Sequence, residues 1–178
     1  MFRKIREAFR KSAERSQAHK DLLRAISDHD YRGVEEICKT SDAIDLNAHS
    51  YAIHAINHGT PKILKILLEH GADPNKWGMS IATNFIVNPA GEAVLGSRPE
   101  MLDVLLQDDR IESPDTAHVW RYADGLGGVC ATPLDLARKR GEAECVELIE
   151  RHLLQKYKAK YEPAAPTQEK APEKKFRP

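Results

Sequence analysis

The segment Leu67–Asn75 (LLEHGADPN) decides the fold, because the segment Ala131–His152 (ATPLDLARKRGEAECVELIERH) completes the same pattern. The later segment opens one helix with a Thr-Pro pair, turns at a glycine and begins a second, leucine-containing helix. The earlier segment ends such a second helix and leads into a Gly-Ala-Asp-x-Asn turn. Repetition of a helix–turn–helix unit predicts a stack in which each unit buries its apolar face against the next.

Fixing the register on Ala137 reveals three more copies of the unit, with Ala25, Ala55 and Ala93 at the same position. A small residue there lets neighbouring helices approach closely. Consecutive alanines are 30, 38 and 44 residues apart, which predicts insertions in the later turns. Gly71 follows the second helix of its unit, where a left-handed cap is expected.

On the motifs Thr132-Pro133-Leu134-Asp135-Leu136-Ala137 and Gly71-Ala72-Asp73-Pro74-Asn75, the chain resembles the ankyrin-repeat family over residues 20–153. The resemblance implies an all-α ankyrin-repeat solenoid of about four helix-turn-helix units, joined by β-turns or loops. The third unit departs from the family pattern. Asn88 replaces the threonine, Ser97 stands at the usual glycine, and residues 107–116 lack the Gly-Ala-Asp-x-Asn turn.

We expect a basic amphipathic helix at 1–19, an ankyrin domain at 20–153, and a helix extension with a disordered tail at 154–178. The predicted repeats span 20–49, 50–87, 88–131 and 132–153. Two interpretations of the N-terminal helix stay open. It either caps the stack or projects freely, or it lies weakly on an anionic membrane through Phe2, Ile5 and Phe9.

The net charge of zero hides a segregation of charge along the chain. Residues 1–20 carry +5 and residues 153–178 carry +4, whereas the acidic middle carries −9. An acidic body argues against nucleic acid binding by the repeats. The sequence has no secretory signal and no apolar run long enough to span a bilayer. We therefore expect an intracellular, cytoplasmic monomer, with delivery into a host cell left open.

The family resemblance also implies a binding surface, formed by the turn tips and the solvent ends of the first helices around a concave groove. Carried over position by position, this surface contains two groups of candidate residues. They are Asp28, His58, Lys139 and Arg140 on the helix ends, and Trp77, Trp120, Arg121 and Tyr122 on the turns. Trp, Tyr and Arg are enriched at binding hot spots. The alternative for Trp77 and Trp120 is that each folds back onto its own loop.

No catalytic constellation, metal site or cofactor motif emerges from the sequence. His54 and His58 share a helix face, but Ala55 stands where a zinc-protease motif needs glutamate. Cys38 and Cys145 fall in apolar stripes and are expected in the core, whereas Cys130 lies in a glycine-rich loop. That loop, Gly125–Gly128, lacks the Gly-Lys-Ser/Thr continuation of a phosphate loop.

The predicted function is therefore non-catalytic recognition of another protein or an extended peptide through the concave groove and inserted loops. The alternative is a membrane- or host-targeted ankyrin effector or regulator. In that case the basic terminal segments direct the protein to its location, and the stack binds the partner.

Overall fold

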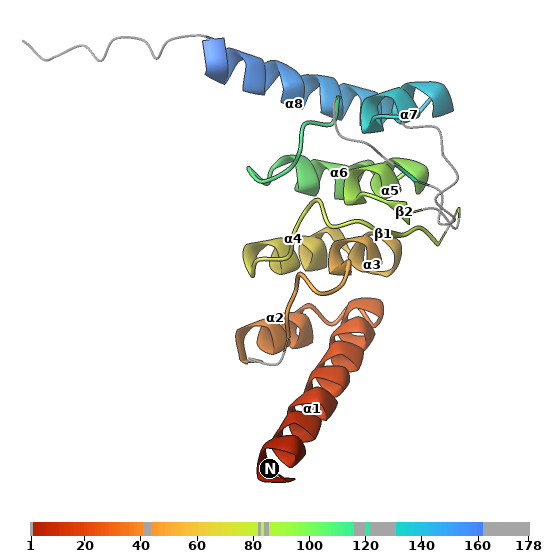
Figure 1. Cartoon of the computed structure of the whole chain (residues 1–178). Helices are drawn as coiled ribbons and strands as arrows, with labels where there is room; N and C mark the ends of the chain where they lie inside the picture. The colour runs from red at the N-terminus through yellow and green to blue at the C-terminus, as the bar shows by residue number, and fades with distance from the viewer. Residues whose placement is uncertain are drawn as a thin grey trace, which may run out of the picture.

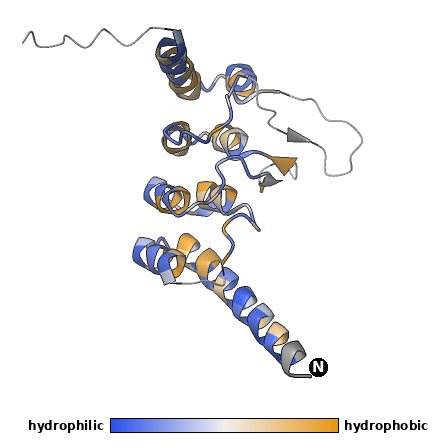
Figure 2. Ribbon diagram, turned by 60° about the vertical axis from the view of Figure 1, so that its left-hand side comes forward, coloured by the Kyte–Doolittle hydropathy of each residue, from blue (hydrophilic) through white to orange (hydrophobic). Residues whose placement is uncertain are grey.

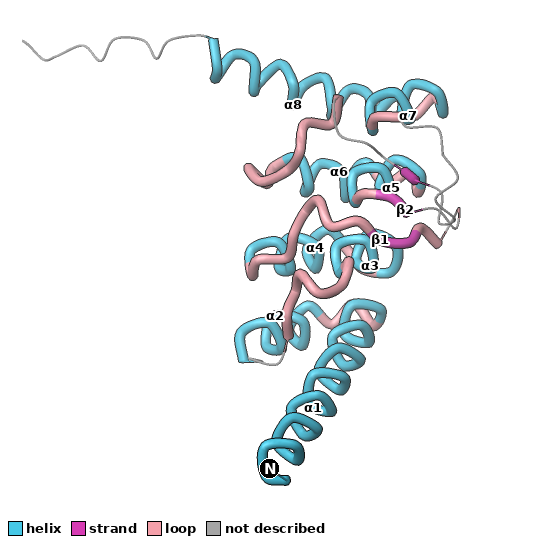
Figure 3. Tube along the Cα trace, viewed as in Figure 1, coloured by secondary structure: helices cyan, strands magenta, loops and turns pink. Residues whose placement is uncertain are grey.

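The computed structural model describes residues 2–40, 44–81, 83, 86–115, 120–121 and 131–161. These ranges form eight helices and three short strands, so the mostly helical fold expected from the sequence is confirmed. The helices, shown in Figures 1 and 3, are α1 (Phe2–Ser27), α2 (Tyr31–Thr40), α3 (Tyr51–His58), α4 (Pro61–Glu69), α5 (Pro89–Leu95), α6 (Pro99–Leu106), α7 (Pro133–Arg140) and α8 (Ala143–Tyr161).

The helices pack as four successive pairs in two columns (Figure 1). Helices α1, α3, α5 and α7 contact one another in that order, and α2, α4, α6 and α8 form the second column. Each helix therefore packs on its partner in the pair and on the equivalent helices of neighbouring pairs. That all four pairs are ankyrin repeats, and where each begins, stays a prediction.

Side-chain caps start the first helices of the last two pairs. Thr132 and Asp135 form a reciprocal capping box on α7, and Pro133 occupies the first turn. At α5, Asn88 takes the place of the threonine, and its Oδ1 accepts from the Gly91 N–H at 2.7 Å. The departure at Asn88 thus preserves the cap, because asparagine caps helices about as well as threonine.

The core lies between the two columns. Ala55, Ala93 and Ala137 are fully buried and Ala25 nearly so, as their position in the repeating unit requires. Cys145 is buried and Cys38 half-buried, which confirms both as core residues. Burial raises the pKa of each thiol to about 11, so both stay protonated at neutral pH.

The turn between the two helices of a pair has a left-handed residue in three of the four pairs. These residues are His29 (φ 57°), Ser97 (φ 51°) and Gly141 (φ 74°). Non-glycine residues are strained in this region. His29 and Ser97 each have a compensating hydrogen bond to the next helix pair. His29 Nε2 donates to His58 O at 2.8 Å, and Ser97 Oγ donates to Glu142 Oε1 at 2.5 Å.

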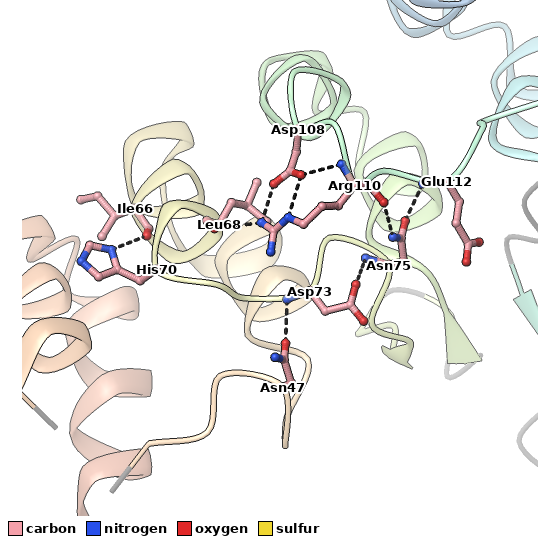
Figure 4. Close-up of polar contacts among 9 residues, drawn as sticks. All are labelled: Asn47, Ile66, Leu68, His70, Asp73, Asn75, Asp108, Arg110 and Glu112. Atoms are coloured by element: carbon pink, nitrogen blue, oxygen red, sulfur yellow. Dashed lines mark hydrogen bonds and ion pairs between the residues drawn. The ribbon is translucent and has the colours of Figure 1, made fainter. Parts of the chain in front are cut away.

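The turns between pairs are linked by asparagine side chains (Figure 4). Asn47 Oδ1 accepts from the Asp73 N–H at 2.9 Å. Asn75, one turn later, accepts from the Glu112 N–H and donates to Arg110 O, both at 2.8 Å. Because every turn amide needs a partner, each asparagine fixes the position of the following turn.

The third turn keeps half of this arrangement. Asp108 Oδ1 accepts from the Arg110 N–H at 2.9 Å, as Asp45 and Asp73 accept from Asn47 and Asn75. Arg110 stands in place of the asparagine, and its Nη2 donates backward to Leu68 O at 2.9 Å. No asparagine stands at the equivalent position of this turn, and among the described residues the Leu134 N–H donates instead to Pro114 O at 3.2 Å.

Helix α1 passes through residues 19 and 20 without a break, although the sequence analysis divided the chain there. Side chains 6–17 are exposed, and this half of the helix projects from the stack (Figures 1 and 2). The sequence analysis proposed that a helix not bound to a membrane would either cap the stack or project freely. The structure fits free projection and does not fit capping. Helix α8 extends to Tyr161 as expected, and the predicted tail lies outside the described residues.

A three-stranded antiparallel sheet is the main difference from the all-α expectation. Its strands are β1 (Gly78–Met79), β2 (Ile86–Val87) and β3 (Trp120–Arg121), in the order β1-β2-β3. Gly78 pairs with Val87, and Val87 pairs with Trp120. The sequence analysis treated these segments as loops, because strands of two residues are too short to show an alternating pattern.

The sheet rests on the beginning of α3. Ser50 precedes that helix without capping it, and its Oγ donates instead to Trp77 O. A Cβ atom on Gly78 would lie 2.5 Å from the Ser50 side chain and 3.0 Å from Ile53 Cδ1. Only glycine therefore fits between strand β1 and helix α3.

Asn75→Ala should destabilise the protein by about 1–2 kcal/mol, because it leaves Arg110 O and the Glu112 N–H without a partner. The matched variant Asn47→Ala removes a single bond and should cost about half as much. Urea unfolding followed by circular dichroism measures both losses. Equal losses would contradict a special role for Asn75 at the third turn.

Gly78→Ala should cost about 1–3 kcal/mol through the clash with Ser50 and Ile53. Gly96→Ala is the control, because its Cβ would meet nothing closer than 3.4 Å, and it should stay within about 0.5 kcal/mol of the wild type. The same urea measurement applies. A Gly78 variant as stable as the control would show that β1 can shift away from α3 without loss.

Candidate functional site

The small sheet brings together the two chain segments that contain tryptophan. Trp77 directly precedes β1 and is half-buried. It is therefore neither fully exposed, as expected for a residue that contacts a partner, nor fully buried, as expected if it folds back onto its own loop. Trp120 and Arg121 form β3, two strands away across the sheet, and their side chains lie outside the described residues. Tyr122 also lies outside them. Backbone pairing through Val87 thus makes neighbours of loops that are more than 40 residues apart in sequence.

The predicted helix-end residues occupy opposite parts of the stack. Asp28 directly follows α1, and His58 is the last residue of α3. Both side chains are exposed. Lys139 and Arg140 are exposed at the end of α7, in the last pair. The four predicted helix-end residues therefore lie at different levels of the stack and do not converge on a single pocket.

Arg140 has a structural partner that the sequence analysis did not anticipate. Its Nη2 donates to Leu95 O at 3.3 Å, and its Nε lies 3.9 Å from Glu142 Oε1. Arg98 makes the equivalent bond one pair earlier, with Nη1 donating to Ile56 O at 2.5 Å. A guanidinium thus satisfies a carbonyl at the end of each preceding first helix, where intrahelical donors are missing. Part of the charge of Arg140 is therefore used within the stack.

A groove beside β1 was missed by the sequence analysis. It is a cavity of about 260 Å³ lined by α1, α3 and β1 residues that include Leu23, His54 and Asn57. Met79 and Ile81 form its rim, with 60% and 62% of their surfaces exposed. Asn57 Nδ2 is buried and has no hydrogen-bond partner among the residues that the structure describes. Exposed apolar residues beside an unpaired donor are typical of binding surfaces, but nothing in the sequence separates them from core residues.

Histidines surround the same groove. The His19 and His49 rings have centroids 4.1 Å apart, and His19 Nδ1 lies 2.7 Å from the Tyr51 hydroxyl. The His54 and His58 rings are 4.7 Å apart. Burial, and next the charge of the neighbouring histidine, lower the pKa of both His19 and His54 below the ordinary value.

The part of the chain that the structure describes contains no group of three or more His, Cys, Asp or Glu side chains placed to hold a metal ion. His70, which directly follows α4, donates from Nδ1 to Ile66 O at 2.9 Å (Figure 4). Among the described helices, none combines the length and the apolar character needed to cross a bilayer.

Comparison with known proteins finds a family match over one part of the chain. Residues 49–78, which span α3, α4 and the following turn, match the family model described as "Ankyrin repeat". No curated protein matches the chain. Ankyrin repeats are generally non-catalytic modules for protein–protein interaction. The match at residues 49–78 supports an ankyrin-repeat protein, and Thr132–Ala137 carries the equivalent motif.

Proposed function

We propose that this protein is a non-catalytic recognition module that binds another protein or an extended peptide on the face bearing the β1–β3 sheet. The observation that carries the proposal is the pairing of Gly78 with Val87 and of Val87 with Trp120. This pairing gathers segments from two long turns beside the first-helix column. Binding residues often lie on loops that a rigid scaffold positions.

The proposed contact surface centres on Trp77 and the adjoining rim residues Met79 and Ile81. Large apolar side chains held on a rigid support bury area at small entropic cost and often supply most of the binding energy. The Ser50 bond to Trp77 O and the close approach of Gly78 to α3 supply that support. Trp120, Arg121 and Tyr122 extend the proposed surface across the sheet.

Charged residues at the two ends of the stack would orient the partner. Asp28 lies at the N-terminal end, and Lys139 lies at the C-terminal end of the same column. Charges at the rim of an interface act on association rate and register more than on affinity. Lys139 is the better test of this role, because Arg140 also holds Leu95 O.

A second function, recruitment to an anionic membrane or delivery as an effector, is favoured by one observation. The basic N-terminal half of α1 projects from the stack, and Phe9 on it is 73% exposed. Basic amphipathic helices bind anionic lipid surfaces. Co-sedimentation with phosphatidylserine vesicles, with and without residues 1–19, tests this function, and equal sedimentation of the two forms would exclude it.

Replacing Trp77 and Trp120 together with alanine should reduce partner capture at least tenfold, as expected for hot-spot residues. The melting temperature should change little if the side chains face the partner. The control is Tyr157→Ala, because Tyr157 is exposed on α8, away from the sheet. Quantitative affinity capture and calorimetry measure the two effects. A large fall in melting temperature with unchanged capture would make both tryptophans structural.

A further inference from the structure

Histidines supply the hydrogen bonds that join the first helix pair to the second. Among the described residues, every side-chain hydrogen bond between α1, with the turn after it, and α3 involves one. His19 Nδ1 bonds to the Tyr51 hydroxyl at 2.7 Å, and His29 Nε2 donates to His58 O at 2.8 Å. Ser27 Oγ donates to Leu23 O, so His54 Nε2 acts as donor to Ser27 Oγ at 3.3 Å.

The imidazole rings at this joint lie in two close pairs. The His19 and His49 centroids are 4.1 Å apart, and the His54 and His58 centroids are 4.7 Å apart. Protonating both members of a pair places two positive charges within contact distance. In the His19–His49 pair these charges face each other between α1 and the turn before α3, whereas in the His54–His58 pair they lie side by side on α3. Because histidine changes charge near neutral pH, mild acidification is enough to introduce this repulsion.

The other charged groups around the His19–His49 pair include one positive and one negative side chain. The surrounding cavity is lined by Arg15 from α1 and by Asp45 from the 44–50 turn, whose charges oppose each other. Asp45 Oδ1 already accepts from the Asn47 N–H. On α1, Asp21 accepts from Gln17 Nε2.

Around the His54–His58 pair the neighbouring elements carry charges of both signs. His54 experiences the charges of His58 and His19. From the third pair, Arg98 donates to Ile56 O near the end of α3, and α5 contributes the buried Glu92. Helix α4 carries Lys62, which lies over the Tyr31 ring, and an exposed ion pair between Lys65 and Glu69. In the turn after α1, Asp28 is exposed and Asp30 Oδ1 accepts from the Gly33 N–H.

We propose that the α1–α3 joint is a proton-sensitive latch, in which protonation of the paired histidines loosens α1 from α3. The geometry that carries this inference is the two ring pairs together with three histidine-mediated bonds at one interface. His29 adds to it, because it holds its bond from a left-handed backbone conformation (φ 57°). Loosening exposes the buried α1 residues Leu22 and Ile26.

The direction of the effect follows from linkage. Burial and neighbouring charge lower the pKa of His19 and His54 in the closed joint, so the opened joint binds protons more readily. The latch is therefore fully closed above the ordinary histidine pKa of about 6.5. It weakens as the pH falls through that value toward the lowered values.

Opening the latch would regulate the proposed binding face. Leu23 from α1 and His54 from α3 line the same groove as Met79, so movement of α1 removes one wall of that groove. This consequence for partner binding rests on the proposed function, whereas the latch itself does not.

Hydrogen exchange followed by mass spectrometry on the full chain tests the latch without a partner. Protection factors, corrected for intrinsic exchange, are compared at pH 7.5 and pH 5.5. We expect residues 19–27 of α1 to lose protection several-fold at pH 5.5, whereas α6 and α7 keep theirs. Equal loss in α6 and α7 would indicate general acid destabilisation and overturn the latch.

The decisive variant is His49→Gln with His58→Gln, because neither of these rings makes a hydrogen bond across the joint in the described residues. It removes one charge from each pair and should clearly reduce the pH dependence in α1, whereas the part that comes from burial of His19 and His54 remains. His152→Gln is the matched control, since His152 lies on α8 and its pKa is also lowered by burial. Unchanged pH dependence in the double variant would overturn the proposal.

The latch and the proposed function fail in distinguishable ways. If exchange in α1 responds to pH as expected but capture does not depend on Trp77 and Trp120, the latch stands and the proposed binding face falls. If capture depends on the tryptophans and α1 exchange does not respond to pH, the binding face stands and the latch falls.

Discussion

The structure depends on the burial of apolar faces between neighbouring helix pairs, because a single pair of such short helices cannot cover its own face. Ala55, Ala93 and Ala137 make this burial possible. Their small side chains let consecutive first helices approach closely, so the larger residues of the second helices fill the space between columns. Every local feature, from caps to turns, serves to place one pair at the correct distance from the next.

Hydrogen bonds across the stack then set the orientation of each pair. Asn47 and Asn75 fix the following turns, whereas Arg98 and Arg140 satisfy carbonyls of the preceding first helices. Backbone groups at turns and helix ends are costly when unpaired, so these side chains give a repetitive core a defined register. The third turn has Arg110 in place of the asparagine, so the asparagine bond to the following turn is not repeated there, and this turn lies in the longest interval between the aligned alanines.

The candidate binding face and the latch occupy neighbouring parts of the same surface. Strand β1 rests on the beginning of α3 through Ser50 and Gly78, and α3 in turn holds α1 through its histidines. A change at the α1–α3 joint therefore reaches the groove beside Met79 through direct contacts. No long-range pathway is needed, because the groove and the joint share Leu23 and His54.

The sequence by itself determined the helical repeat, because helix caps, the Gly71 turn and the buried alanines are local requirements written at fixed spacing. It also identified Cys145 as a core residue. Tertiary structure alone decided the sheet, since its two-residue strands pair across insertions of unpredictable path. It likewise decided the projection of α1, the use of Arg140 within the stack, and the meeting of five histidines at one joint. These features depend on contacts between residues far apart in the chain, which periodicity along the sequence does not encode.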